Sequence, residues 1–391
     1  MTRKADWLVV GMGLTGAVIA SEIARKLNQR VVIVDRRAHL GGNAYDLRDK
    51  AGVLVQKYGA HIFHTNSAKV ADYLSAFTGW FPYEHRVLAF IGGQFVPVPF
   101  NLTSMELVFG RQEGHKLNKL LTDEFGGEVK VPILKMRESP HAEIRKVADV
   151  IYEKLFLHYT VKQWGLTPEQ LDPSVAGRVP VFLSRDDRYF QDKFQKMPKL
   201  GFSQMIGRML EHPNIEVRTG IEFPKAAEAV RFNRMVFTGP IDEFFGAVHG
   251  RLPYRSLRFE FQNTQSPKLL QKAGVENYPT PESEHPYTRV IEFRHFNGQE
   301  WASSTTRAFE YPQEYRPGGN EPYYSIHHEE SRLLYGKYAE MARKLSTVVF
   351  VGRLADYAYY NMYQAVARAL HCFETGIVPR ARALRSAALL S

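Results

Sequence analysis

The chain has 391 residues, 44% of them hydrophobic and 24% charged, which is typical of a globular protein with two or three packed domains. It carries 51 Lys and Arg against 41 Asp and Glu, a formal charge of +10, but the basic residues are scattered rather than gathered in tracts. Phosphorylated small molecules are therefore the favoured anionic partners, and no nucleic acid is expected.

Hydropathy and cysteine usage exclude two further classes of protein. No apolar run approaches the ~20 residues that a membrane span needs. The single cysteine, Cys372, excludes an internal disulfide and a cysteine-based zinc site. We therefore expect no membrane insertion, no metal and a cytoplasmic location.

The N-terminal residues predict a β–α–β unit with a glycine-rich turn. Its elements are expected at Trp7–Val10 (strand), Leu14–Leu27 (helix) and Val31–Asp35 (strand). In the GxGxxG pattern between strand and helix, Gly11 permits a tight turn, Gly13 lets the backbone approach pyrophosphate, and Gly16 lets the helix pack on the strand. Asp35 stands ~20 residues past the last glycine, where a carboxylate binds the adenine ribose. The unit predicts a dinucleotide site with the pyrophosphate at the helix N-terminus.

The rest of the chain divides by composition. Charged residues spaced between Leu, Val, Ile and Phe predict helices from 101 to about 162, and aromatics, prolines and short β-like runs predict antiparallel sheet from about 177 to 324. Two apolar segments, Met235–Thr238 and Thr347–Val351, are typical of buried strands of a parallel sheet. An amphipathic helix is expected from Asn361 to about Phe373.

The residues after the second strand favour FAD over NAD. Arg36-Arg37 and then Gly41-Gly42-Asn43 resemble FAD proteins of the glutathione-reductase type, in which a basic residue and a glycine pair lie along the flavin side of the cofactor. The helix after Gly352-Arg353 would place its N-terminus at the flavin pyrimidine edge, where it stabilises negative charge on reduced flavin.

These patterns predict an α/β fold with α+β insertions, in which several domains are discontinuous. A Rossmann-like FAD-binding domain is expected from residues 1–75, 205–245 and 335–391. A helical domain is expected at 100–165, and an antiparallel-sheet substrate domain at 76–99, 166–204 and 246–334.

Ten motifs in order resemble bacterial UDP-galactopyranose mutase along nearly the whole chain. They are Gly11–Gly16, Leu40–Asn43, Tyr58–Thr65, His158–Gly165, Arg178–Val181, Asp187–Phe190, Phe237–Asp242, Tyr287–Val290, Pro322–Tyr324 and Val351–Leu354. The resemblance implies an isomerase that interconverts UDP-galactopyranose and UDP-galactofuranose. It also implies that N5 of reduced FAD attacks the anomeric carbon and expels UDP, before the sugar ring opens and recloses in the other size.

The resemblance also assigns the site residues. It gives catalytic roles to Arg178 and Arg289, which hold the diphosphate and stabilise the leaving UDP, and to His64, which tunes or relays protons. The cofactor-binding residues are Gly11, Gly13, Gly16, Asp35, Arg36, Gly42, Asn43, His61, Arg353 and Met362. The substrate-binding residues are Phe156, Tyr159, Thr160, Trp164, Arg178, Tyr189, Asn277, Arg289, Tyr324, Tyr359 and Asn361.

Three of these assignments carry specific expectations. Phe156 and Tyr159, three residues apart on a helix, are expected to sandwich the uracil. The Trp164 segment lies in the family near a loop that closes over substrate. His61 and His64 are not expected to bind a metal, since no third ligand stands nearby in sequence.

Departures from the family pattern leave the sugar open. Relatives often carry a basic residue at Ala358, an acid at Tyr363 and Asp at Asn361. Alternatives are therefore a mutase for another UDP-sugar, a flavin-dependent oxidase of the amine-oxidase-like fold, and a non-catalytic nucleotide-binding protein. The expected partners are a UDP-sugar, a reductant such as NADPH, and a second copy of the chain in a homodimer or higher homo-oligomer.

Overall fold

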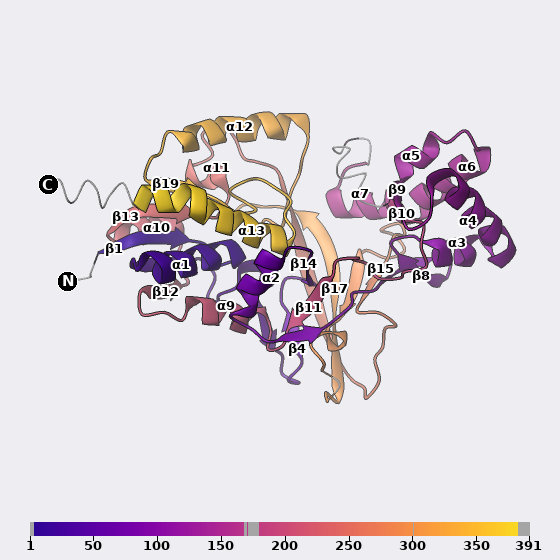
Figure 1. Ribbon diagram of the computed structural model, residues 1–391, viewed down its shortest axis with the longest axis horizontal. Helices are drawn as coiled ribbons and strands as arrows, with labels where there is room; N and C mark the ends of the chain where they lie inside the picture. Colours follow the sequence, from indigo (N-terminus) through magenta and orange to yellow (C-terminus); the bar gives the residue numbers. More distant parts are fainter. Residues whose placement is uncertain (1–3, 168–169, 171–179, 300, 382–391) are drawn as a thin grey trace.

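The computed structural model describes residues 4–167, 170, 180–299 and 301–381. A parallel sheet with its helices forms one end of the elongated molecule, a group of helices forms the other, and a long antiparallel sheet lies between them (Figure 1). This arrangement matches the predicted α/β class with inserted helical and antiparallel parts.

The parallel sheet draws its strands from distant parts of the sequence. Within the described residues its order is β12 (Ile215–Thr219), β2 (Val31–Asp35), β1 (Ala5–Val10), β13 (Phe232–Phe237) and β19 (Val348–Phe350). Every neighbouring pair is parallel. The strands expected near residues 7, 31, 235 and 347 are confirmed, whereas β12, which is half exposed and carries charged residues, was not foreseen.

Both faces of this sheet are covered by helices. The covering helices are α1 (Leu14–Leu27), α9 (Phe202–Leu210), α10 (Phe223–Ala229), α11 (Ile241–Phe244), α12 (Glu329–Arg343) and α13 (Met362–Cys372). Because side chains alternate along a strand, Trp7 and Val9 of β1 pack in the core with α1, and Leu8 and Val10 pack in a second core with α10. Helix α13 lies along α1 (Figure 1).

The large antiparallel sheet forms the middle of the molecule. Among the described residues its order is β18 (Tyr324–Ser325), β14 (Tyr254–Gln265), β17 (Ser304–Glu314), β16 (Arg289–Glu292), β15 (Val275–Asn277), β7 (Val87–Ile91) and β8 (Gln94–Val98). Only the β15–β7 pair in this order is parallel. The long hairpin-like pair of β14 and β17 runs from Arg255 opposite Glu314 to Gln265 opposite Ser304.

Short strands and one further helix connect the larger parts. They are β3 (Asp46–Arg48), β4 (Leu54–Gln56), β5 (Phe63–Thr65), α2 (Ala68–Ser75), β6 (Trp80–Pro82), β9 (Lys130–Pro132), β10 (Pro180–Phe182) and β11 (Phe194–Pro198). Strand β11 pairs with both β5 and β6, so residues 194–198 are joined by hydrogen bonds to two strands of the N-terminal region.

The helices expected between residues 101 and 162 are confirmed. They are α3 (Leu102–Phe109), α4 (Arg111–Phe125), α5 (Ile133–Arg137), α6 (Ala142–Ile151) and α7 (His158–Trp164). A π-helical turn, η2 (Tyr152–Leu157), joins α6 to α7. The last of these helices ends at Gly165, which adopts the left-handed conformation with φ of 66°.

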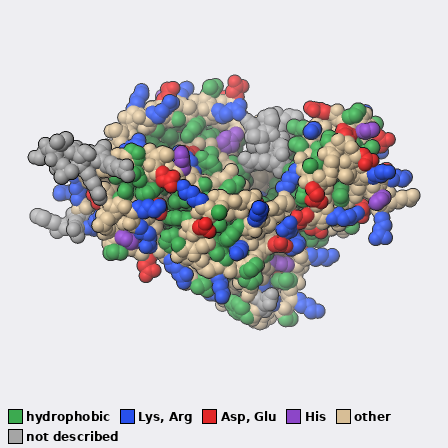
Figure 2. All heavy atoms as spheres, in the orientation of Figure 1, with side chains coloured by type: hydrophobic (Ala, Val, Ile, Leu, Met, Phe, Trp, Pro, Cys, Tyr) green, Lys and Arg blue, Asp and Glu red, His purple; other side chains and the backbone are tan. Residues whose placement is uncertain are grey.

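Two observations concern the charge of the surface and the hydropathy of the helices. Figure 2 shows basic and acidic side chains interspersed over the visible face, with no single basic block. In the described part of the chain, no helix is both long and apolar enough to cross a membrane.

Candidate active site

A cavity of about 930 Å³ lies where the carboxyl ends of β1, β2 and β13 meet the large antiparallel sheet. Val10, Asp35 and Thr238 line it at the ends of these strands. This edge is where open α/β sheets bind their ligands. The cavity is therefore the place to look for both cofactor and substrate.

Each of the three glycines in the first turn is required, or tolerated, for a different structural reason. Gly11 has φ of 99°, and a Cβ there would lie 2.0 Å from Thr238 Oγ1. A Cβ on Gly16 would lie 1.9 Å from the carbonyl oxygen of Gly11, so this glycine lets the helix pack on the turn. Gly13 has an ordinary φ of −75°, and its Cβ would meet Gly42 Cα at 3.9 Å. The fold thus tolerates a side chain at Gly13, and the glycine there fits the close approach of a ligand such as the FAD pyrophosphate.

The next part of the cavity holds charged residues after β2. Asp35 accepts hydrogen bonds from the backbone N–H of Met12 at 2.8 Å and of Arg37 at 2.9 Å. Arg36 and Arg37 both donate to Glu321 at 2.6 Å, and Arg37 also donates to Asn43 Oδ1 at 2.9 Å. Glu321 therefore ties the segment before β18 to the turn that carries the dinucleotide residues.

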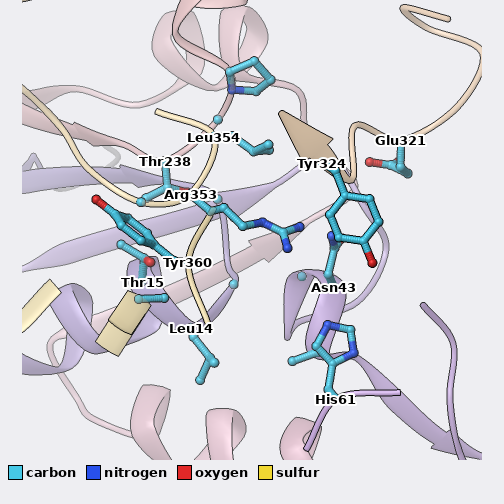
Figure 3. A pocket seen from close by; sticks show the side chains of 18 of the residues that line it. Leu14, Thr15, Asn43, His61, Thr238, Glu321, Tyr324, Arg353, Leu354 and Tyr360 are labelled. Carbon is cyan, nitrogen blue, oxygen red and sulfur yellow. The ribbon is translucent and has the colours of Figure 1, made fainter. Parts of the chain in front are cut away.

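Arg353 enters the cavity from the turn before α13. Gly352 has φ of 113°, and its N–H donates to Asp356 Oδ2 at 3.0 Å; Arg368 of α13 holds the same carboxylate at 3.1 Å. Figure 3 shows the Arg353 side chain extending into the cavity between Tyr360 and Tyr324. Asp356 thus links the turn that carries Arg353 to α13.

His61 lies on the opposite wall, next to Asn43 (Figure 3). Its Nδ1–H donates to the carbonyl oxygen of Gly59 at 2.8 Å. Burial, together with the positive charges of Arg353 and Arg289, lowers the pKa of His61 to about 4. The imidazole is therefore neutral near pH 7.

Arg289 is the centre of a row that crosses three strands of the large sheet. Asn277 of β15 lies opposite Arg289 of β16, which lies opposite Glu310 of β17. Arg289 Nε is 3.0 Å from Glu310 Oε1, and Nη2 donates to Tyr159 Oη at 2.9 Å. Burial alone would lower the pKa of Arg289, but the carboxylate of Glu310 raises it well above its usual value. Asn277 Oδ1 is buried without a partner among the described residues and so remains available to a ligand.

Tyrosines surround this fixed cation. Tyr159, Tyr189, Tyr324 and Tyr359 all line the cavity. Tyr324 and Tyr359 stack with ring centres 5.5 Å apart, and Trp164 lies 5.8 Å from Tyr324. Burial raises the pKa of Tyr159 and of Tyr324, which keeps both phenols protonated as hydrogen-bond donors. One arginine and several phenolic hydroxyl groups together could donate hydrogen bonds to the oxygens of a diphosphate.

Two cations hold α7, which carries Tyr159, against the large sheet. The Lys162 ammonium donates to the carbonyl oxygens of Tyr278, His285 and Tyr287 at 2.7, 2.9 and 3.0 Å. From β14, Arg255 Nε donates to the carbonyl oxygen of Gln163 at 3.0 Å, in the last turn of the helix. We call this arrangement the α7 clasp.

Most of the predicted site residues line this one cavity. They are Gly11, Gly13, Asp35, Arg36, Gly42, Asn43, His61, His64, Tyr159, Tyr189, Asn277, Arg289, Tyr324, Arg353, Tyr359, Asn361 and Met362. Arg178 lies outside the described residues, and its role stays a prediction.

Four predicted residues are not in the cavity lining: Gly16, Phe156, Thr160 and Trp164. Phe156 is buried against Tyr152, with ring centres 5.6 Å apart. It lies in the π-helical turn η2, where the residues per turn exceed those of an α-helix, so spacing of three does not place it on the face of Tyr159. The stacking of Phe156 on uracil therefore finds no support in this geometry.

The structure adds lining residues that sequence reasoning missed: His85, Phe190, Thr238 and Glu321. Phe190 and Thr238 lie inside motifs that were noticed, and the end of a parallel strand is a signal for Thr238. No sequence signal marks His85 or Glu321, because their partners come from distant elements. No group of His, Cys, Asp and Glu in the described residues has the arrangement of a metal site.

Comparisons with known proteins point to one family of enzymes. The family model described as UDP-galactopyranose mutase matches residues 154–359, and a model of an NAD(P)-binding Rossmann-like domain matches residues 9–77. The "probable UDP-galactopyranose mutase" of Klebsiella pneumoniae is 36% identical over 366 residues, which cover 93% of this chain and 92% of that protein. The dTDP-fucopyranose mutase of Escherichia coli is 31% identical over 374 residues, covering 93% of this chain and 96% of that protein.

A solved structure of reduced UDP-galactopyranose mutase shares the fold, with a TM-score of 0.72 and 15% identity over 96% of this chain and 94% of that one. The predicted α/β class is thereby confirmed. The Rossmann-like match, the mutase relatives and the fold together support FAD as the cofactor and an isomerase as the kind of enzyme. The chain belongs to the UDP-galactopyranose mutase family.

Proposed function

We propose that the chain interconverts UDP-galactopyranose and UDP-galactofuranose with FAD in its reduced form. The observation that carries this proposal is one cavity that runs from the Gly13 turn to Arg289 and its tyrosines. The first end suits the pyrophosphate of FAD, and the second suits the diphosphate of a sugar nucleotide. The name of the Klebsiella pneumoniae relative supports the choice of sugar.

The residues of the chain would hold the cofactor from several sides. Gly13 gives room for the pyrophosphate at the N-terminus of α1, and Asp35 has lone pairs left for the adenine ribose. His61 and Arg353 both line the cavity (Figure 3) and would contact the flavin. Reduced FAD, when bound, supplies N5 as the nucleophile that attacks the anomeric carbon of the sugar.

Arg289 would bind the diphosphate and favour departure of UDP. Its charge is fixed by Glu310, and its orientation is fixed by Tyr159. A preoriented cation stabilises the charge that develops on the leaving diphosphate and therefore accelerates the reaction as well as binding substrate. Arg178 is assigned the second cationic contact, and Tyr189, Tyr324 and Tyr359 the neutral hydrogen bonds.

The test is conversion of UDP-galactofuranose to UDP-galactopyranose by the purified protein, followed by HPLC. The protein is compared after reduction with dithionite and in the oxidised state. Conversion by the reduced protein alone supports the mutase. Stoichiometric bleaching of oxidised flavin by a substrate, with an oxidised product, would instead support the oxidase alternative. A protein that does not take up FAD would contradict the proposal.

A second candidate is a mutase for a different nucleotide sugar. It is favoured by the Escherichia coli relative named dTDP-fucopyranose mutase and by Ala358, which stands where many mutases carry a cation. The same assay with dTDP-fucose and a panel of UDP-sugars separates the two candidates by their ratios of kcat/KM.

Three further expectations belong to this proposal. A reductant such as NADPH would keep the flavin reduced, and a second copy of the chain would complete a homodimer or larger oligomer in the cytoplasm. The division into an FAD-binding domain (1–75, 205–245 and 335–391), a helical domain (100–165) and a substrate domain (76–99, 166–204 and 246–334) is supported by the composition of the sheets. Strand β11, at 194–198, pairs across this division with β5.

A further inference from the structure

A carboxylate–imidazole pair lies in the wall of the cavity. His64, in β5, lines the cavity, and its Nδ1–H donates to Asp192 Oδ2 at 2.8 Å. The imidazole stacks on Phe190 with ring centres 3.6 Å apart and planes 12° apart, and Tyr363 of α13 meets it edge-on at 5.6 Å. A carboxylate on one nitrogen and aromatic rings around it hold this side chain in a single orientation.

Asp192 is itself held in place by the strand that pairs with β5. Gln195 lies directly opposite His64 in the β5–β11 register. Its Nε2 donates to the carbonyl oxygens of Phe190 and Asp192, each at 3.0 Å. One buried amide therefore fixes both the ring that stacks on His64 and the carboxylate that binds it. A surface ion pair would not need such support.

The hydrogen bond determines which nitrogen of His64 can act on a ligand. A carboxylate accepts, so Nδ1 carries the proton, and in the neutral ring Nε2 carries the lone pair. Burial lowers the pKa of the His64 imidazole, and Asp192 opposes this effect by raising it. The neutral ring therefore presents Nε2 as a proton acceptor, and Asp192 stabilises the imidazolium that forms when Nε2 takes a proton.

Ring exchange of a hexose needs such a group. When the pyranose becomes a furanose, one C–O bond at the anomeric carbon breaks and a bond to another oxygen of the same sugar forms there. The oxygen that is released gains a proton, and the hydroxyl that closes the new ring loses one. One base that takes the second proton and delivers the first balances the exchange without any other reactant.

We infer that Asp192 is a positioning residue that fixes His64 with Nε2 as the proton acceptor for sugar hydroxyls, a role that rests on the proposed mutase function. The observation behind it is the Asp192–His64 bond in the cavity wall, braced by Gln195. Its ligand is the open-chain sugar during ring exchange.

Among the residues that the structure describes, the titratable side chains around this imidazole other than Asp192 are aromatic or histidine rings. His85 lies beyond Phe190, with its ring centre 6.0 Å from that ring, and Tyr189 meets Phe190 edge-on at 4.9 Å. Tyr363 is the titratable contact from α13. Burial lowers the pKa of His85 to about 3, so His85 is neutral near pH 7 and adds no charge beside His64.

The kinetic test compares Asp192→Asn with the parent, as reduced holoenzyme with UDP-galactofuranose. We expect kcat to fall about 10- to 100-fold, with KM changed less than about threefold and FAD still bound. The acidic limb of the kcat profile should move to lower pH, because the lost carboxylate no longer stabilises the imidazolium. His64→Ala should lose at least as much, and the double variant should be no worse than His64→Ala. Lys193→Gln, an exposed neighbour, is the matched control.

Loss of kcat without movement of the acidic limb would assign Asp192 a structural role only and overturn the inference. Histidine-selective ¹⁵N NMR gives a readout that does not depend on turnover. The His64 signals, identified by their absence in His64→Ala, should show a protonated Nδ1 in the parent and a changed tautomer ratio in Asp192→Asn. A protonated Nε2 in the parent overturns the inference, whereas correct tautomers in a protein that converts no sugar would overturn the proposed function instead.

Discussion

Replacing Gly13 by alanine adds a single methyl group and so tests the cofactor site. The Gly13 φ of −75° suits any residue, and a Cβ would lie 3.9 Å from Gly42 Cα, so alanine fits the turn itself. The same methyl group would stand where the pyrophosphate must approach the backbone. We expect Gly13→Ala to melt within a few degrees of the FAD-free parent but to bind FAD about tenfold or more weakly, measured by flavin fluorescence titration.

Gly11→Ala is the comparison for that experiment. Gly11 has φ of 99°, and its Cβ would collide with Thr238 Oγ1, so this variant should lose folding stability as well as FAD. Normal FAD affinity in Gly13→Ala would place the cofactor elsewhere.

Replacing Arg289 by lysine tests the substrate end of the cavity. Lysine keeps the charge but cannot at once pair with Glu310, donate to Tyr159 and grip a diphosphate. We expect Arg289→Lys to lower kcat/KM about 100-fold, the loss of roughly one charge-assisted hydrogen bond, while FAD affinity stays the same. Arg258→Lys, at a half-exposed arginine on β14, is the control. A fall of less than about threefold would contradict the role of Arg289.

Residues inside motifs were predictable from sequence, and their partners were not. Arg289 and Tyr159 belong to motifs that pointed to phosphate and base recognition, and the structure joins them by a hydrogen bond. Glu310 and Asp192 stand in no such motif. They matter because strand pairing brings β17 and β11 beside β16 and β5, which local sequence does not encode.

Loss of the α7 clasp should weaken substrate binding more than cofactor binding. Methionine at Lys162 keeps much of the apolar stem but leaves the carbonyl groups of Tyr278, His285 and Tyr287 without their shared donor. We expect Lys162→Met to lower hydrogen-exchange protection of residues 158–164 about tenfold and to weaken UDP binding, with FAD binding retained. Lys154→Met, an exposed lysine in η2, is the control. Unchanged protection in Lys162→Met would contradict the role of Lys162 in holding α7 against the large sheet.

Helices and strands with strong hydrophobic periodicity were predicted from the sequence. Elements whose conformation depends on tertiary contacts were not. The helix expected at 14–27 and the strand at 31–35 match α1 and β2, because buried apolar runs and the glycine turn define them locally. The π-helical turn η2 has no sequence signature, and it changes the angle between Phe156 and Tyr159 from the one that α-helical spacing predicts. The stacking of Phe156 on uracil stays a prediction.

At the scale of the whole molecule, burying neutral histidines around the cavity makes stability depend on pH. Burial lowers the pKa of His61 to about 4 and of His85 to about 3, and it also lowers the pKa of His64. Unfolded histidine titrates near ~6.5, so below that pH the unfolded chain binds more protons than the folded one, and stability falls as pH falls. Burial raises the pKa of Asp46 and of Glu310, an effect with the opposite sign.

His85→Gln isolates the histidine contribution from these opposing effects. Glutamine can keep the hydrogen bond that joins Tyr83 Oη to His85 Nδ1 at 3.1 Å, but it does not titrate. Between about pH 6.5 and about pH 4.5 the parent should lose about 2 kcal/mol more stability than His85→Gln, since each buried neutral histidine contributes up to about 1.4 kcal/mol per pH unit. Urea unfolding followed by circular dichroism at several pH values measures this difference, with His249→Gln, at an exposed histidine, as control. Equal pH dependence in parent and His85→Gln would mean that burial does not lower the pKa of His85, so that this imidazole gains its charge in the folded protein as readily as in the unfolded chain. In that case the cavity wall at His85 would become positive as the pH falls below about 6.5, and the substrate would meet a cation there only in acid.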